Sequence, residues 1–179
     1  MNYYIVGSKY NRGDYYEDVF PQMVEKDVVS VGFAAGHDLT HLYQTDENKI
    51  TQYLEGVNEG TYAIAALKRF LNLSPGDLIA IKGSGSPVGK RPRLIIVGYA
   101  IVVDRDGLVY QHDPDGLGHL VNVEFLEISL EKEFGLGYGM TIHKLEKQEH
   151  AKLIFGLYYQ VSSHPEANKK GDYPLTAST

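Results

Sequence analysis

The side chains with the clearest chemical potential form a short cationic cluster. Lys82, Lys90, Arg91 and Arg93 place four positive charges within twelve residues that contain no acid, around the glycine- and serine-rich segment 83–89. Each cation that neutralises a phosphate adds a salt-dependent contribution to nucleic-acid affinity. The cluster therefore predicts phosphate binding. The alternative is a solvated hairpin whose lysines prevent the pairing of exposed strand edges.

The overall charge makes this cluster stand out. The chain has 17 Lys+Arg against 23 Asp+Glu, so its net charge is −6, and the part outside the cluster carries −10. Proteins that bind nucleic acid through broad electrostatics are usually basic, because phosphate neutralisation supplies most of their affinity. We therefore expect any polyanion to be bound through a local patch.

The glycine–serine segment matches neither common nucleotide-binding fingerprint. In a P-loop, Ser84 would have to be glycine and Arg91 would have to be serine or threonine. Gly83, Gly85 and Gly89 give the spacing Gly-x-Gly-x-x-x-Gly, which differs from the dinucleotide motif. We expect no bound cofactor.

Catalytic and metal-binding patterns are weak in this sequence. With no cysteine, thiol nucleophiles and Cys-ligated metals are excluded. His37 and His41 are four residues apart, but the metalloprotease motif needs glutamate where Asp38 stands. We predict no catalytic residues and no metal site, although a small carboxylate- or histidine-dependent enzyme remains an alternative.

Aromatic residues offer a different kind of site. Of the 20 aromatic residues 14 are tyrosine and none is tryptophan. Tyrosine has a flat apolar face and a polar tip, which suits both half-exposed cores and the stacking of nucleobases. Tyr15, Tyr16 and Phe33 lie in or beside irregular connections, where a pocket could form.

The elements that must position these residues can be read from the hydrophobic pattern. Apolar spacing predicts helices over residues 45–57, 61–73 and 151–158, and a short one within 15–26. Residues 8–14 are expected to form a loop, and Gly98 to mark a bend or bulge. Strands are expected at residues 3–7, 28–33, 78–82, 93–103, 108–111, 120–128 and 140–144.

This order of elements predicts an α+β fold built on a half-open mixed β-barrel of about six strands, with helices packed outside. We expect one domain over residues 1–160 and a polar tail or linker over residues 161–179. The longest apolar run, ten residues, is far short of the ~20 needed to span a membrane. Together with the lack of a visible signal peptide, this predicts a soluble, cytoplasmic protein without a membrane partner.

Three segments carry a family resemblance: Val31-Gly32-Phe33, the helix over residues 67–73 with its Pro75-Gly76-Asp77 turn, and the strand Ile95-Ile96-Val97-Gly98-Tyr99. In this order they resemble the EVE branch of the PUA-like superfamily, which also contains YTH domains. The most similar type is the N-terminal recognition domain of McrBC-type modification-dependent restriction systems.

The resemblance implies a DNA-binding module that extrudes a methylated or hydroxymethylated base and holds it in an aromatic pocket. Phe33 would stack on the base, the backbone of Ser30, Val31 and Gly32 would line one wall, and Asp38 would bind the base edge. Lys82 and Ser84 would face the pocket from the next strand end, and Tyr15 and Tyr16 are the further aromatic candidates for its wall. Lys82, Lys90, Arg91 and Arg93 would hold phosphate.

The implied partners are modified double-stranded DNA and further domains of a restriction enzyme in the same chain. An RNA-binding PUA-like module is the first alternative, since the same fold serves single-stranded RNA. A domain that binds only proteins is also compatible with the fold.

Overall fold

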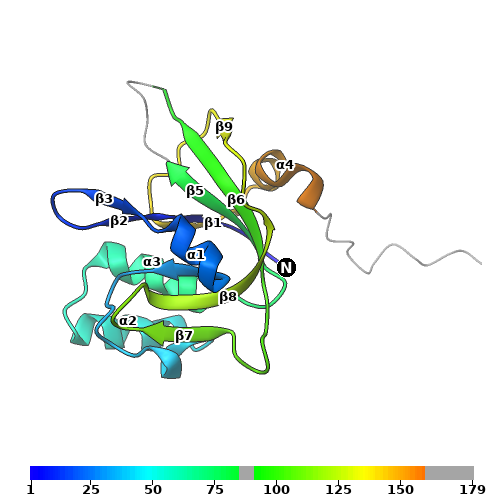
Figure 1. Cartoon of the computed structure of the whole chain (residues 1–179). Coiled ribbons are helices and arrows are strands. Elements are labelled where there is room, and N and C mark those ends of the chain that lie inside the picture. Colours follow the sequence, from blue (N-terminus) through cyan, green and yellow to red (C-terminus); the bar gives the residue numbers. More distant parts are fainter. Residues whose placement is uncertain (85–90, 160–179) are drawn as a thin grey trace, which may run out of the picture.

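A strongly curled mixed sheet forms the centre of the molecule (Figure 1). The structure is a computed structural model, and it describes residues 1–84 and 91–159. Along the sheet the strands follow the order β10-β1-β5-β6-β8-β4, while β7 pairs with β8 and β9 with β6. Their bounds are β1 Tyr3–Gly7, β4 Val28–Val31, β5 Leu78–Ser84, β6 Leu94–Val102, β7 Tyr110–Asp113, β8 Gly118–Glu127, β9 Lys132–Phe134 and β10 Ile142–Lys144.

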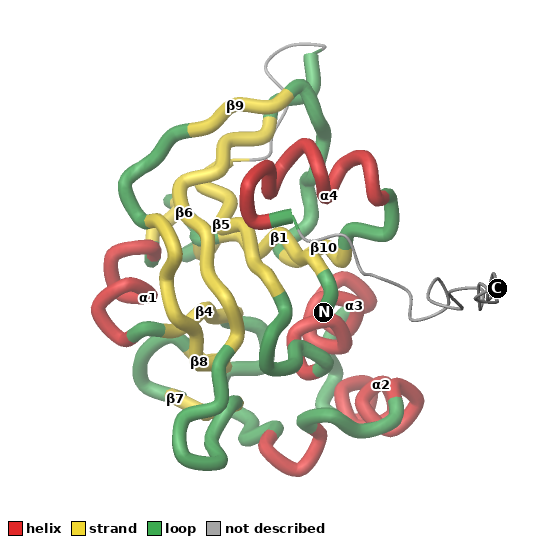
Figure 2. Tube along the Cα trace, turned by 90° about the vertical axis from the view of Figure 1, so that its right-hand side faces the viewer, coloured by secondary structure: helices red, strands yellow, loops and turns green. Residues whose placement is uncertain are grey.

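Helices cover the sheet on different sides, and Figure 2 shows α4 well apart from α2 and α3. The described residues form four α-helices, α1 Phe20–Lys26, α2 Glu47–Gly56, α3 Thr61–Leu71 and α4 Gln148–Phe155, and two short 3-10 helices, η1 Thr40–Leu42 and η2 Gly156–Tyr158. Helix α3 buries one face, which includes Leu67, Phe70 and Leu71, in the largest core cluster. Helix α4 buries Ile154 and Phe155 in a second cluster around Tyr99. The prediction of an α+β fold with a six-stranded half-barrel is confirmed at this level.

The pairing of β1 with β5 positions the residues of the candidate site. These strands are parallel and pair Gly7 with Lys82, so β1 ends beside the last residues of β5. The register between β5 and β6 shifts at Ile81/Lys82, opposite Gly98, and a Cβ at Gly98 would lie 2.8 Å from the Phe20 ring. The predicted bulge near Gly98 is therefore confirmed, and the missing side chain at this position leaves room for the Phe20 ring.

One sequence prediction was wrong. Residues 8–14, expected to be a loop, contain β2 (Lys9–Asn11), which forms a hairpin with β3 (Tyr16–Asp18). The short helix predicted within residues 15–26 is confirmed as α1, which begins at Phe20, after β3. The hairpin strands have three residues each, too few for a recognisable apolar alternation. Figure 1 shows this hairpin projecting from the body of the molecule.

The sequence analysis also missed strand β9, which has three residues like the hairpin strands.

Within residues 1–84 and 91–159, no helix is long and apolar enough to cross a membrane. Lys90, most of the glycine–serine segment and the expected tail, residues 161–179, lie outside the described residues.

Candidate functional site

A cavity of about 710 Å³ opens where β1, the β2–β3 hairpin and the end of β5 meet. Its volume lies within the ~300–1,000 Å³ that is usual for small-molecule sites. The loop after β4, the first turn of α3 and the loop before β10 complete the wall. The lining residues are Gly7, Lys9, Tyr10, Asn11, Arg12, Tyr16, Gly32, Phe33, Tyr62, Lys82, Gly83, Ser84, Gly139 and Thr141.

The lining of this cavity is cationic in an acidic protein. Lys9, Arg12 and Lys82 contribute three positive side chains, whereas none of the described residues that line the cavity is aspartate or glutamate. Arg12 forms an ion pair with Glu17 at 2.7 Å, outside the lining. The lining therefore favours an anionic or acceptor-rich ligand even though the chain as a whole carries −6.

Lys82 is the most buried of these cations, with 7% of its surface exposed. Its Nζ donates to the carbonyl oxygens of Tyr138 at 2.7 Å and Met140 at 2.6 Å. Burial lowers the pKa of Lys82 to about 8. Among the residues that the structure describes, no carboxylate forms an ion pair with this ammonium. An ammonium has three donors, so one remains for a ligand.

Aromatic rings form another part of the wall. Phe33 and Tyr62 meet edge to face, with ring centroids 5.7 Å apart and planes at 73°. The Tyr62 hydroxyl accepts a hydrogen bond of 2.9 Å from the backbone N–H of Thr141, which ties α3 to the loop before β10. Tyr16, on the hairpin, is 70% exposed. Large exposed aromatic rings at the mouth of a cavity are suited to stacking on a flat ligand.

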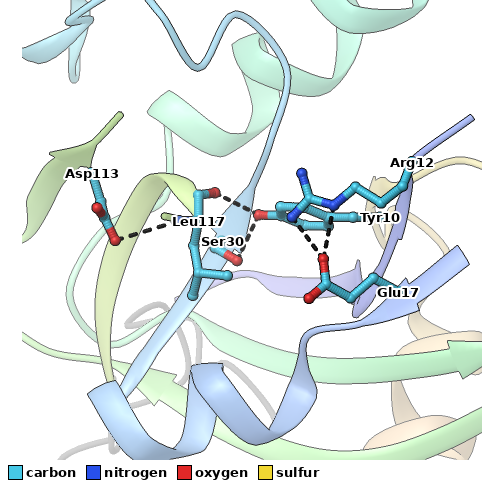
Figure 3. Close-up of polar contacts among 6 residues, drawn as sticks. All are labelled: Tyr10, Arg12, Glu17, Ser30, Asp113 and Leu117. Atoms are coloured by element: carbon cyan, nitrogen blue, oxygen red, sulfur yellow. Dashed lines mark hydrogen bonds and ion pairs between the residues drawn. The ribbon is translucent and has the colours of Figure 1, made fainter. Parts of the chain in front are cut away.

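Tyr10 anchors the hairpin to the body of the protein (Figure 3). Its hydroxyl is hydrogen-bonded to the Ser30 hydroxyl and to the Leu117 carbonyl oxygen, both at 2.7 Å. Its ring packs under Gly32, where a Cβ would lie only 2.9 Å from the ring. The Arg12 guanidinium stacks over the same ring at 5.3 Å from its centroid. These contacts fix the position of the hairpin side of the cavity.

A pair of histidines holds the segment that follows Phe33. The Nε2 atoms of His112 and His119 lie 2.7 and 3.2 Å from the carbonyl oxygens of Ala35 and Ala34. The His119 Nδ1 is 2.6 Å from the Tyr110 hydroxyl. Burial lowers the pKa of His119 to about 4, so its ring is neutral at pH 7. When the Nδ1 of this neutral ring accepts a hydrogen bond from the Tyr110 hydroxyl, its Nε2 carries the proton and donates to the Ala34 carbonyl. That bond holds Ala34 in its left-handed conformation, at φ +51°.

The structure brings together about half of the predicted site residues. Gly32, Phe33, Ser84 and Tyr16 line the cavity, and so does Lys82, which was predicted both to face the pocket and to bind phosphate. The other predicted pocket residues lie elsewhere: Ser30 and Val31 are fully buried, while Asp38 and Tyr15 are exposed and are not among the lining residues.

Asp38 has a local structural role. Its carboxylate accepts hydrogen bonds from the backbone N–H and the hydroxyl of Thr40 at the start of η1, and these bonds lower its pKa. Of the predicted phosphate ligands, Arg91 is exposed, Arg93 forms an ion pair of 3.0 Å with Glu133, and neither lines the cavity. Lys90 lies outside the described residues.

His37 and His41 do not share a helix face. Both rings pack edge-on against Tyr53, and only His41 lies in η1. In the described part of the chain, no three His, Asp or Glu side chains are grouped closely enough to hold a metal ion.

Sequence reasoning missed Lys9, Tyr10, Asn11 and Arg12 because it missed the hairpin that carries them. Gly13 was a local hint of the turn, which it makes at φ +90°, but the strands on either side are too short to be recognised by alternation. Tyr62 and Thr141 gave no signal, because their roles depend on the contact between α3 and the loop before β10.

The sequence matches no protein-family model, and no curated protein matches it. The EVE resemblance therefore stays a prediction. The residues of the cavity carry the functional proposal.

Proposed function

We propose that this chain is a PUA-like, EVE-type nucleic-acid-binding module that recognises a modified base in double-stranded DNA. The base leaves the helix and enters the cavity, as in the targeting domain of a modification-dependent restriction system. The observation that carries this proposal is the combination of aromatic walls, three cations and no acid in one cavity. A nucleotide offers the matching groups: a flat base, and a phosphate on either side.

The placement of the cations supports the same ligand. Lys9 and Arg12 lie on the exposed hairpin, and Lys82 is buried. Exposed cations at the mouth of the cavity suit backbone phosphates, which stay in contact with water. A buried donor suits the edge of the base.

The energies are compatible with base extrusion. Removing a base from the stack costs a few kcal/mol, and stacking on an aromatic side chain returns ~1–3 kcal/mol per base. Phe33, Tyr62 and Tyr16 can supply this stacking. Contacts to the modification then decide which base is held.

The experiment is a binding measurement by fluorescence anisotropy at low salt. Labelled duplexes differ in one base: unmodified, N6-methyladenine, 5-methylcytosine, 5-hydroxymethylcytosine or 5-carboxylcytosine. A preference of tenfold or more for one modified duplex, ~1.4 kcal/mol, supports the proposal. Phe33→Ala should remove the preference. Leu157→Ala, which truncates a fully exposed side chain outside the cavity lining, should keep it.

Equal or absent binding to every duplex would overturn the proposal. A matched single-stranded RNA belongs in the same series, because tighter binding to RNA would favour the RNA-binding alternative.

A further inference from the structure

Lys82 places a positive charge in the wall of the cavity without a charged partner. Both of its acceptors are neutral backbone carbonyls, and in the described part of the chain no acid pairs with it. A buried, unpaired charge is costly. A ligand that brings a negative charge to this position would be bound more tightly than a neutral ligand of the same shape.

The backbone phosphate is the less suitable source of that charge. Lys9 and Arg12 are exposed on the hairpin and can meet phosphates without stripping them of water. Lys82 is 7% exposed, so its partner must be a group that itself enters the cavity. For a nucleotide with its base in the cavity, that group is a substituent of the base.

We propose that the modified base held in this cavity carries a carboxylate, which accepts a hydrogen bond from the remaining N–H of Lys82. This inference rests on the proposed function and narrows it from modified bases in general to anionic ones. A 5-carboxylcytosine fits this description. N6-methyladenine and 5-methylcytosine, which add only apolar groups, do not.

Two further features agree with this assignment. No lining residue that the structure describes is acidic, so a carboxylate meets no acidic side chain in this part of the wall. Lys82 is held in place by Tyr138 and Met140 before any ligand arrives, so little side-chain entropy is lost on binding. The loop that supplies these carbonyls also supplies Gly139 and Thr141 to the lining.

The proposal also predicts how binding depends on pH. The pKa of Lys82 is about 8 without ligand, and a bound carboxylate raises it, so the preference for the carboxylated base is complete below pH 8 and declines above it. Burial, together with the charges of Lys82 and Arg69, lowers the pKa of His143 on β10 to about 4, so this ring stays neutral in this range. The other ionisable groups in the described lining are Lys9, Arg12, Tyr10, Tyr16 and Tyr62, and they are the same for every duplex compared.

The test compares duplexes that carry one cytosine, 5-methylcytosine, 5-formylcytosine or 5-carboxylcytosine at the same position. At pH 7 we expect the carboxylated duplex to bind at least tenfold more tightly than the formylated one, which has nearly the same shape but no charge. Lys82→Met should remove this difference. Lys144→Met, at an exposed lysine outside the cavity, is the matched control and should keep it.

A wild-type titration from pH 7 to 9.5 gives a second measurement that does not depend on the folding of a variant. The ratio of affinities for the carboxylated and formylated duplexes should fall as the pH rises through this range. A ratio near one at pH 7, or a ratio that does not change with pH, would overturn the proposal.

The outcomes separate this inference from the proposed function. Preference for 5-methylcytosine over 5-carboxylcytosine would refute the carboxylate assignment and leave base recognition intact. Absence of binding to every duplex would refute both. The wild type could also bind carboxylated and unmodified duplexes equally well, with Lys82→Met losing affinity for both. That result would show that Lys82 binds a backbone phosphate, and it would refute the carboxylate assignment.

Discussion

Phe33 and Tyr62 meet edge to face at 5.7 Å, although one follows β4 and the other lies in the first turn of α3. Their contact closes one corner of the cavity. Phe33 is held from behind by the histidine bonds to Ala34 and Ala35, and Tyr62 is held by its bond to the backbone of Thr141. Segments that are distant in the sequence thus fix the aromatic wall.

Phe33→Ala should weaken the recognition of the modified base without unfolding the protein. Phe33 is only partly buried, so its loss leaves a modest cavity, whereas the stacking lost is ~1–3 kcal/mol, or about 5- to 150-fold in affinity. Anisotropy titrations measure the affinity, and circular dichroism reports the fold. Unchanged discrimination between modified and unmodified duplexes would exclude Phe33 from the site.

Tyr10→Phe should destabilise the protein and loosen the hairpin. The substitution leaves the Ser30 hydroxyl and the Leu117 carbonyl without their shared partner in a buried position, at a cost of ~1–3 kcal/mol. Thermal unfolding measures this loss. A melting temperature equal to that of the wild type would mean that these bonds do not anchor the hairpin.

His119 should make the protein sensitive to acid. Its pKa is about 4 in the folded state and near 6.5 in the unfolded state, so below pH 6.5 the unfolded chain binds a proton that the folded one does not. The free energy of unfolding should therefore fall by up to ~3 kcal/mol between pH 6.5 and 4 from this residue alone.

The matched variant is His119→Gln, which can still donate to Ala34 but does not titrate. Urea unfolding at several pH values should show a shallower pH dependence for this variant than for the wild type. His143 also lowers the free energy of unfolding in acid, because its pKa is about 4 in the folded state as well. This contribution is the same in both proteins. If the free energy of unfolding had the same pH dependence in the two proteins, the lowered pKa of His119 would be contradicted.

Lys82 should have an effect of the same sign at alkaline pH. Its pKa is about 8 when folded and near 10.4 when unfolded, so between these values the unfolded chain binds the extra proton and the free energy of unfolding rises with pH. The rise attributable to Lys82 is up to ~3 kcal/mol. The difference in stability between the wild type and Lys82→Met, followed from pH 7 to 10.5, isolates it. A difference that stays constant with pH would show that Lys82 is not desolvated.

The main elements of the fold were predictable because their signals are local and repeated. Helix α3 shows its apolar face through Leu67, Phe70 and Leu71, and β6 is a continuous apolar run around Gly98. The β2–β3 hairpin was not predictable in this way, since each strand has three residues and its stability depends on Tyr10 reaching Ser30 and Leu117 across the molecule.

The site was predictable only in part, for a related reason. Phe33, Lys82 and Ser84 could be identified because strand ends often carry binding residues. The buried state of Lys82 could not, because it depends on the carbonyls of Tyr138 and Met140, which tertiary folding brings to it. Ser30 and Val31 lie on β4 just before Phe33 but belong to the core, because strand β4 is buried along its whole length.

The central claim is that a modified base leaves the DNA helix and enters the cavity beside Phe33. It is tested most directly with 2-aminopurine placed next to the modified base in a duplex, since this fluorescent base brightens when its neighbour leaves the stack. We predict a fluorescence increase at saturating wild-type protein, a much smaller one with Phe33→Ala, and none with an unmodified duplex. Saturated binding of the modified duplex without any increase would contradict the claim.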